Sequence, residues 1–277
     1  MPESALRFRP VGACIYCGAD GGAVRLSDEH IIPYALNGKA ILPLSSCACC
    51  AKITSALELR LARGIFQPMR LLSGFRTRRP KKRPKTLPVF EVDDVDGLAS
   101  KPMHIPLDVH PAFHILPSFE QPGILVGKEP SDQFHNMKLY TWFPSDLNDR
   151  MARMKAMGMK KSMLESFSLA DFVRLLAKIA HGAAVADFGH GHFRPLLLDL
   201  ILDKSSLPGY SAHYVGGAPG KLPDTERSTH RVSTAVHHVN EKALLVVTIR
   251  LFGFLVPPAP VYVVVAGEFS LQTFCAA

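Results

Sequence analysis

Two Cys-x2-Cys pairs near the N-terminus constrain this chain more than any other feature. Cys14 and Cys17 form the first pair, Cys47 and Cys50 form the second, and 29 residues separate the pairs. The opening residues lack the apolar stretch of a secretory signal, so we expect a cytoplasmic, reducing setting that favours metal binding over disulfides. Four thiolates at this spacing predict a closed, tetrahedral structural zinc site, with Cys49 as a spectator.

The segment between the two pairs carries the residues suited to chemistry. It reads Ser27-Asp28-Glu29-His30-Ile31-Ile32-Pro33, and Gly38 follows. After Cys50, the apolar residues Ile53, Leu57 and Leu61 recur at every fourth position, and Gly64 is a plausible helix stop. The pattern therefore predicts a short hairpin followed by a helix, in ββα order.

An acidic residue, a histidine, two aliphatic residues and a proline between two knuckles resemble the core of the zinc-containing HNH (His-Asn-His) endonucleases of the ββα-metal type. The resemblance implies an endonuclease that hydrolyses phosphodiester bonds, with His30 as the general base. It also implies that Glu29 binds a catalytic Mg²⁺ or Mn²⁺, distinct from the structural zinc. The resemblance covers about fifty residues, under a fifth of the chain.

Two positions depart from that family pattern. Many zinc-type members place Asn or His directly after the last knuckle cysteine, where this chain has Ala51. The family's central Asn is also missing from Leu42 to Ser46, and Asn37 lies earlier. These departures leave a second hypothesis open, in which the chain is a catalytically inactive, zinc-stabilised nucleic-acid-binding or regulatory protein.

The positive charge is confined to the first third of the chain. Residues 1–87 contain 15 Lys or Arg against 5 Asp or Glu, whereas residues 88–277 contain 17 against 19. Seven of these basic residues surround two prolines in one short arm: Arg76, Arg78, Arg79, Lys81, Lys82, Arg83 and Lys85. Such an arm is either a solvated linker or a phosphate-binding surface. Beside a nuclease-like module we expect it to bind nucleic acid, DNA rather than RNA. An anionic membrane surface would be attracted by the same charge.

The rest of the chain predicts an α+β domain with antiparallel strands. Three segments are expected: 1–75 as the zinc-containing ββα module, 76–87 as the basic linker or arm, and 88–277 as this larger domain. A role for the last segment in targeting or oligomerisation is a hypothesis, because the sequence determines neither its function nor the oligomeric state.

Local patterns indicate several elements of the larger domain. Ser168 resembles a helix N-cap, and it precedes an apolar face of Phe172, Leu175, Leu176, Ile179 and Ala180. A second helix is expected over Arg194 to Leu202, and short strands over Leu87 to Val92 and Gly123 to Val126. The apolar stretch Ala243 to Ala266 is interrupted by Arg250, Gly253 and prolines, which predicts buried antiparallel strands rather than a membrane span.

Overall fold

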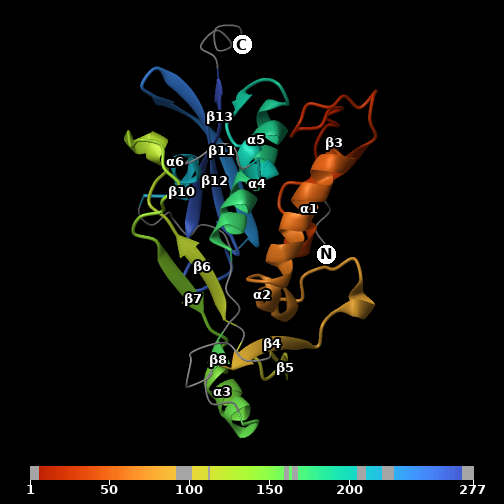
Figure 1. Ribbon diagram of the computed structural model, residues 1–277, viewed down its shortest axis with the longest axis vertical. Helices are drawn as coiled ribbons and strands as arrows, with labels where there is room; N and C mark the ends of the chain where they lie inside the picture. The colour runs from red at the N-terminus through yellow and green to blue at the C-terminus, as the bar shows by residue number, and fades with distance from the viewer. Residues whose placement is uncertain are drawn as a thin grey trace.

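The computed structural model describes residues 6–91, 102–111, 113–158, 162–163, 168–204, 210–219 and 228–269. Helices and mostly antiparallel strands are both well represented, which confirms the predicted α+β class (Figure 1). Within these ranges, no helix combines the length and the apolar character needed to cross a membrane.

The N-terminal module has the predicted ββα order. Strand β2 (Leu26–His30) pairs antiparallel with β3 (Ala40–Cys47), and helix α1 (Ala48–Arg63) follows directly. The short strand β1 (Leu6–Arg7) runs parallel to β3, and the 3-10 turn η1 (Tyr34–Leu36) lies in the loop between β2 and β3. The backbone N–H of Gly64 closes α1 on the carbonyl of Arg60. Leu57 and Leu61 are buried as expected, whereas Ile53 is exposed.

The basic arm crosses from the first module to a small lobe. Helix α2 (Gln67–Leu72) precedes the arm, which contains the 3-10 turn η2 (Pro80–Lys82) and ends as β4 begins. Strands β4 (Thr86–Glu91), β5 (Met103–Pro106) and β8 (Ser162–Met163) form a sheet, and α3 (Leu147–Ala156) packs beside it at the lower end of Figure 1. This lobe has its own small core, formed by Val89, Ile105, Val109 and Met154. The strand predicted from Leu87 is thus found as β4, and Val92 lies outside the described residues.

One predicted strand is wrong. The segment Gly123–Val126 forms the 3-10 helix η3 between the paired strands β6 (His114–Ser118) and β7 (Lys138–Trp142). Pro122 precedes the turn, and Gly127 ends it in a left-handed conformation at φ 68°. These two residues give the segment the chemistry of a turn, which overrides its short apolar run.

The largest sheet confirms the antiparallel strands predicted for the C-terminal region. Its order is β10 (Val215–Gly217), β13 (Val261–Phe269), β12 (Lys242–Leu251) and β11 (His230–Val239), and β9 (Arg194–Pro195) pairs with β13. Helix α4 (Leu169–Phe188) covers one face, while η3 and α6 (Ser211–Tyr214) contribute to the other. Because both faces are covered, successive residues of β12 and β13 are buried, which explains the continuous apolar stretch. The second predicted helix begins at Leu198 rather than at Arg194, as α5 (Leu198–Leu202), because Arg194 pairs with β13.

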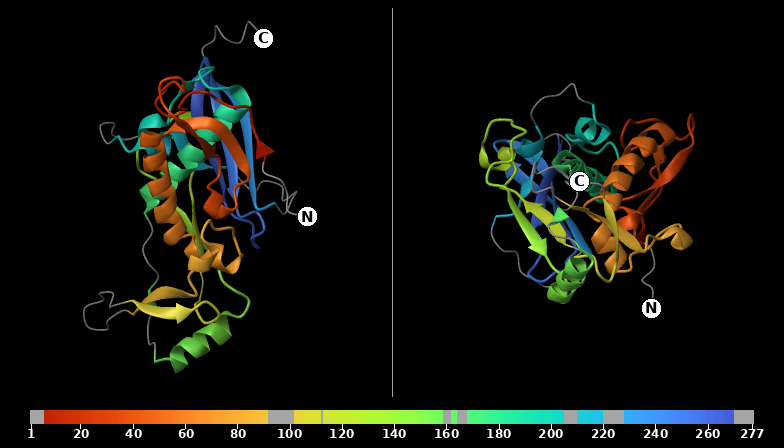
Figure 2. Two further views of the ribbon diagram at one scale, coloured as in Figure 1. Left: turned by 90° about the vertical axis from the view of Figure 1, so that its right-hand side faces the viewer. Right: turned by 60° about the horizontal axis from the view of Figure 1, so that its bottom comes forward.

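Helix α4 joins the large sheet to the N-terminal module. Its N-cap is Ser168, whose hydroxyl accepts the backbone N–H of Asp171, as predicted. Figures 1 and 2 show α4 between the sheet and α1. One continuous core includes the cysteine module and the sheet, from Cys14 to Phe269. The predicted domain boundaries at residues 75 and 87 stay a prediction, because the cysteine module and the large sheet share this core.

Candidate zinc centre and the His30 site

The two knuckles bring four thiols together as predicted. Cys14 and Cys17 lie in the loop before β2, where the N–H of Gly18 bonds to the carbonyl of Cys14 at 2.8 Å and Gly18 has a φ of 74°. Cys47 ends β3 and Cys50 lies in the first turn of α1.

The sulfur positions fit a zinc ion. All four Sγ atoms lie within 4.8 Å of one another, and those of Cys17 and Cys47 are 3.7 Å apart. A tetrahedral ion with Zn–S bonds of about 2.3 Å places its sulfurs about 3.8 Å apart. The backbone hydrogen bond from Cys50 lowers the pKa of the Cys47 thiol to about 7, whereas burial raises the pKa of Cys14. Four sulfur ligands leave no open position, so this site is suited to holding the fold rather than to catalysis.

The carboxylate of Glu29 lies inside the molecule and pairs with a lysine of α4. Glu29 is 8% exposed, and its Oε1 is 2.7 Å from Nζ of Lys178, which is 1% exposed. The same ammonium lies 2.6 Å from Oε1 of Glu58 in α1 and donates to the backbone carbonyl of His30. Burial and nearby Glu58 raise the pKa of Glu29, and Lys178 opposes that shift. Burial alone would lower the pKa of Lys178, but the two carboxylates outweigh it and raise that pKa.

The imidazole of His30 has a different environment from the carboxylate of Glu29. His30 is half-buried at the end of β2, and its ring lies edge-on to Tyr34 at 5.6 Å. The guanidinium of Arg78 sits 5.7 Å from the centre of the same Tyr34 ring. Burial lowers the pKa of His30, and the positive charges of Lys178 and Arg78 lower it further. The structure thus brings the predicted base and a residue of the basic arm, far apart in sequence, around one tyrosine.

These contacts do not fit a divalent ion at Glu29. Its carboxylate already faces the Lys178 ammonium, and Ala51 in the first helical turn of α1 presents a methyl group instead of a metal ligand. Across the described ranges, the four cysteines are the one cluster of three or more Cys, His, Asp or Glu side chains close enough to hold a metal. Glu29 and His30 are consecutive strand residues, which point to opposite faces, so they do not converge on one ion.

The basic arm divides into two kinds of residue. Six side chains are exposed: Arg76, Arg78, Arg79, Lys81, Lys82 and Lys85. Arg83 is partly buried, and its guanidinium donates to the carbonyls of Arg70, Leu71 and Phe75 at 3.0, 2.7 and 3.3 Å. Those bonds satisfy carbonyls at and beyond the end of α2, so Arg83 holds the arm against the module.

Sequence reasoning missed the polar residues of α4 that contact the N-terminal module and the region of α5. Asp171, Arg174, Lys178 and His181 form a stripe at helical spacing, opposite the apolar face. Asp171 pairs with Arg60 of α1 at 2.7 Å, and Nε2 of His181 bonds to the carbonyl of Ile15 at 2.7 Å. The spacing of these polar residues is visible in the sequence. A polar stripe on a helix, however, ordinarily indicates a face exposed to solvent.

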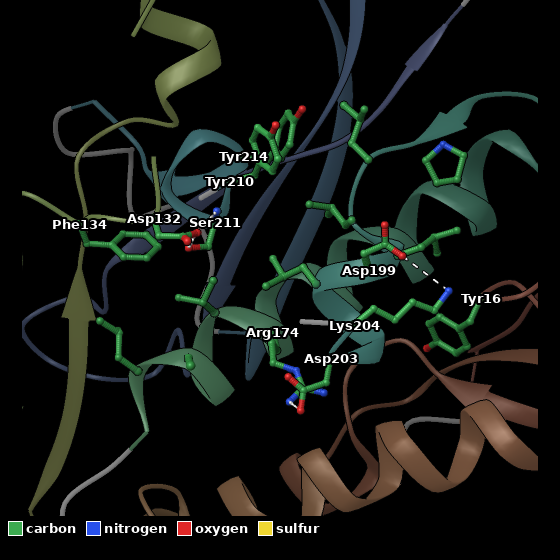
Figure 3. A pocket seen from close by; sticks show the side chains of 18 of the residues that line it. Tyr16, Asp132, Phe134, Arg174, Asp199, Asp203, Lys204, Tyr210, Ser211 and Tyr214 are labelled. Carbon is green, nitrogen blue, oxygen red and sulfur yellow. Dashed lines mark hydrogen bonds and ion pairs between the residues drawn. The ribbon is translucent and has the colours of Figure 1, made fainter. Parts of the chain in front are cut away.

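A separate cavity of about 720 Å³ lies between Tyr16 of the zinc module and helices α4, α5 and α6 (Figure 3). Its walls mix aliphatic and aromatic side chains with three cations, Arg174, Arg194 and Lys204, and three carboxylates, Asp132, Asp199 and Asp203. Arg174 pairs with Asp203 at 2.9 Å, and Lys204 lies 3.6 Å from Asp199. This balanced lining lacks the excess positive charge of a phosphate-binding surface.

Comparisons of the chain with family profiles, with curated proteins and with solved structures found no match in any of the three.

Proposed function

We propose that this protein hydrolyses phosphodiester bonds in nucleic acid, DNA rather than RNA, with His30 as the general base. The observation that carries the proposal is the position of the His30 imidazole at the end of β2, against Tyr34, whose ring also faces the guanidinium of Arg78 from the basic arm. The four-cysteine cluster, suited to structural zinc, supports the hairpin that presents His30.

The charge state of His30 suits this role. Since its pKa lies below the ordinary value, the imidazole is neutral at pH 7 and can accept a proton from an attacking water. The planar guanidinium of Arg78 offers two parallel N–H donors to a phosphate. Both groups belong to this chain.

We expect His30→Ala to lower the rate of plasmid or oligonucleotide cleavage by about 10² to 10⁴, the usual contribution of a general base. Binding should persist, because the zinc module and the exposed arm are unchanged. The assay compares cleavage and binding for DNA and RNA, with Mg²⁺, with Mn²⁺ and with chelator. His237→Ala, an exposed histidine on β11, is the matched control. Unchanged cleavage by His30→Ala would remove His30 from the mechanism.

The pH profile, taken where the protein is still folded, gives a second readout of His30. Cleavage should be insensitive to this group from about pH 7 to 8, because a pKa below the ordinary value leaves the imidazole neutral there. As the pH falls below the ordinary histidine value, protonation should remove the base and lower the rate. A profile that rises toward acid pH would contradict the assignment.

A second function is favoured by a specific contact. Glu29 is paired with Lys178, and Ala51 provides no metal ligand, which suits a zinc-stabilised protein that binds nucleic acid without cutting it. In that case the wild type should bind DNA or RNA and cleave neither across a full metal titration.

The arm should make binding depend strongly on salt. Replacing Arg76, Arg79, Lys81 and Lys82 by Ala should flatten the plot of log affinity against log salt, by about 0.9 for each phosphate of duplex DNA that the arm no longer neutralises. Fluorescence anisotropy at several salt concentrations measures this slope. Lys242→Ala, in an exposed position at the start of β12, should leave it unchanged. An unchanged slope in the fourfold variant would show that the arm is a linker.

A further inference from the structure

Three oxygens from two segments, β2 and α1, converge on one buried ammonium. Nζ of Lys178 lies 2.7 Å from Oε1 of Glu29 in β2 and 2.6 Å from Oε1 of Glu58 in α1, and it donates to the carbonyl of His30. The three N–H groups of an ammonium thus face three acceptors. Lys178 itself comes from α4, 148 residues after His30.

This grouping has the chemistry of a cation site. Burying a charged ammonium is unfavourable unless acceptors replace its water, and here two carboxylates and a carbonyl do so. Carboxylate and carbonyl oxygens are also the ligands that hard divalent ions prefer. Two carboxylates against one ammonium leave an excess negative charge that a divalent ion would neutralise completely.

We propose that Glu29, Glu58 and the His30 carbonyl form an oxygen-lined cation site whose resident cation is the ammonium of Lys178. A divalent ion cannot bind at Glu29 while this ammonium is in place. Lys178 is then a positioning residue that holds the backbone of His30 on the face of α4. The exclusion of metal rests on the contacts alone, and only its consequence for catalysis rests on the proposed function.

The direct test measures binding of Mn²⁺ alone to the full, zinc-loaded chain. Calorimetry or the electron paramagnetic resonance signal of free Mn²⁺ gives the affinity and stoichiometry. We expect no site tighter than millimolar in the wild type, and one Mn²⁺ per chain, bound at least tenfold more tightly, in Lys178→Met. Adding Glu29→Gln to Lys178→Met should abolish the new site. Arg174→Met, which removes another buried cation of α4, is the matched control and should gain no Mn²⁺ site.

Two results would overturn the proposal. One is a wild-type Mn²⁺ site tighter than millimolar that Glu29→Gln removes, because the carboxylate would then be available to metal. The other is a folded Lys178→Met variant that binds no Mn²⁺.

Lys178→Met leaves the buried carboxylate of Glu29 and the partly buried carboxylate of Glu58 without a cation, so a variant that is unfolded without metal is tested again with Mn²⁺ present. Folding on addition of Mn²⁺, followed by circular dichroism, would support the proposal. Failure to fold with Mn²⁺, while the variant that also carries Glu29→Gln and Glu58→Gln folds, would refute it. None of these measurements uses cleavage, so a failure of the proposed nuclease activity is recognised separately, in the plasmid assay.

Discussion

Replacing Cys14 by Ser is expected to unfold the N-terminal module and to destabilise the rest of the chain. Structural zinc sites contribute about 10 to 16 kcal/mol of apparent binding free energy, comparable to or larger than the whole stability of about 5 to 15 kcal/mol of an ordinary protein. Cys14, Cys47 and Cys50 are buried in the same core as Leu57 and Phe172, so loss of the ion removes packing on both α1 and α4.

Elemental analysis and thermal unfolding test this expectation together. The wild type should contain one tightly bound zinc per chain, and a strong chelator should reproduce the effect of Cys14→Ser. Cys49→Ser is the matched control, because Cys49 is exposed and lies outside the thiol cluster. Freshly purified protein without zinc, or equal melting of the Cys14 and Cys49 variants, would refute the zinc site.

Mild acid is expected to unfold the protein through its buried histidines. Burial lowers the pKa of each of four to about 4: His110, His114, His181 and His230. In the unfolded chain these groups titrate near 6.5, so the unfolded state binds more protons as the pH falls from 6.5 toward 4. Stability is therefore fully present above pH 6.5 and declines below it. By pH 4.5, protonation of each histidine in the unfolded chain lowers the free energy of unfolding by on the order of 2 to 3 kcal/mol. The four together lower it by on the order of 10 kcal/mol.

The surroundings of His230 show why protonation is unfavourable. Nε2 bonds to the carbonyl of Leu36 at 2.6 Å, while Nδ1 faces the backbone N–H of Phe252 at 3.3 Å. A neutral ring satisfies both partners by donating from Nε2 and accepting at Nδ1, but a protonated ring would place two donors against each other.

Urea unfolding between pH 7.5 and 4.5 should show a falling midpoint. Zinc release in acid acts in the same direction, so zinc content is measured at every pH. A stability that stays level across this range would contradict the histidine account.

The local elements of this fold could be predicted because their causes lie within a few residues. The knuckle spacing brings two thiols to one point, and Ser168 caps α4 through the backbone of Asp171, three residues away. Short segments with competing signals were less predictable: the turn chemistry of Pro122 and Gly127 prevailed at Gly123–Val126.

The candidate site was predictable only in part. The motif singled out Glu29 and His30, yet the alternation of a strand sends them to different surroundings. The arm was visible as seven charges, but its sequence does not distinguish Arg83, which bonds to carbonyls near α2, from Arg78, which reaches Tyr34 beside His30.

The sequence by itself determined the cysteine cluster, the α+β class and the main helix of the C-terminal region, because these follow from spacing, capping and periodicity along the chain. Only the tertiary structure decided that Lys178 meets Glu29 and Glu58, and that Arg78 lies beside the tyrosine that touches His30. Periodicity shows that a helix has a polar stripe, but the partner of that stripe depends on which segments pack against it. For Lys178 those partners lie 120 or more residues away in the chain.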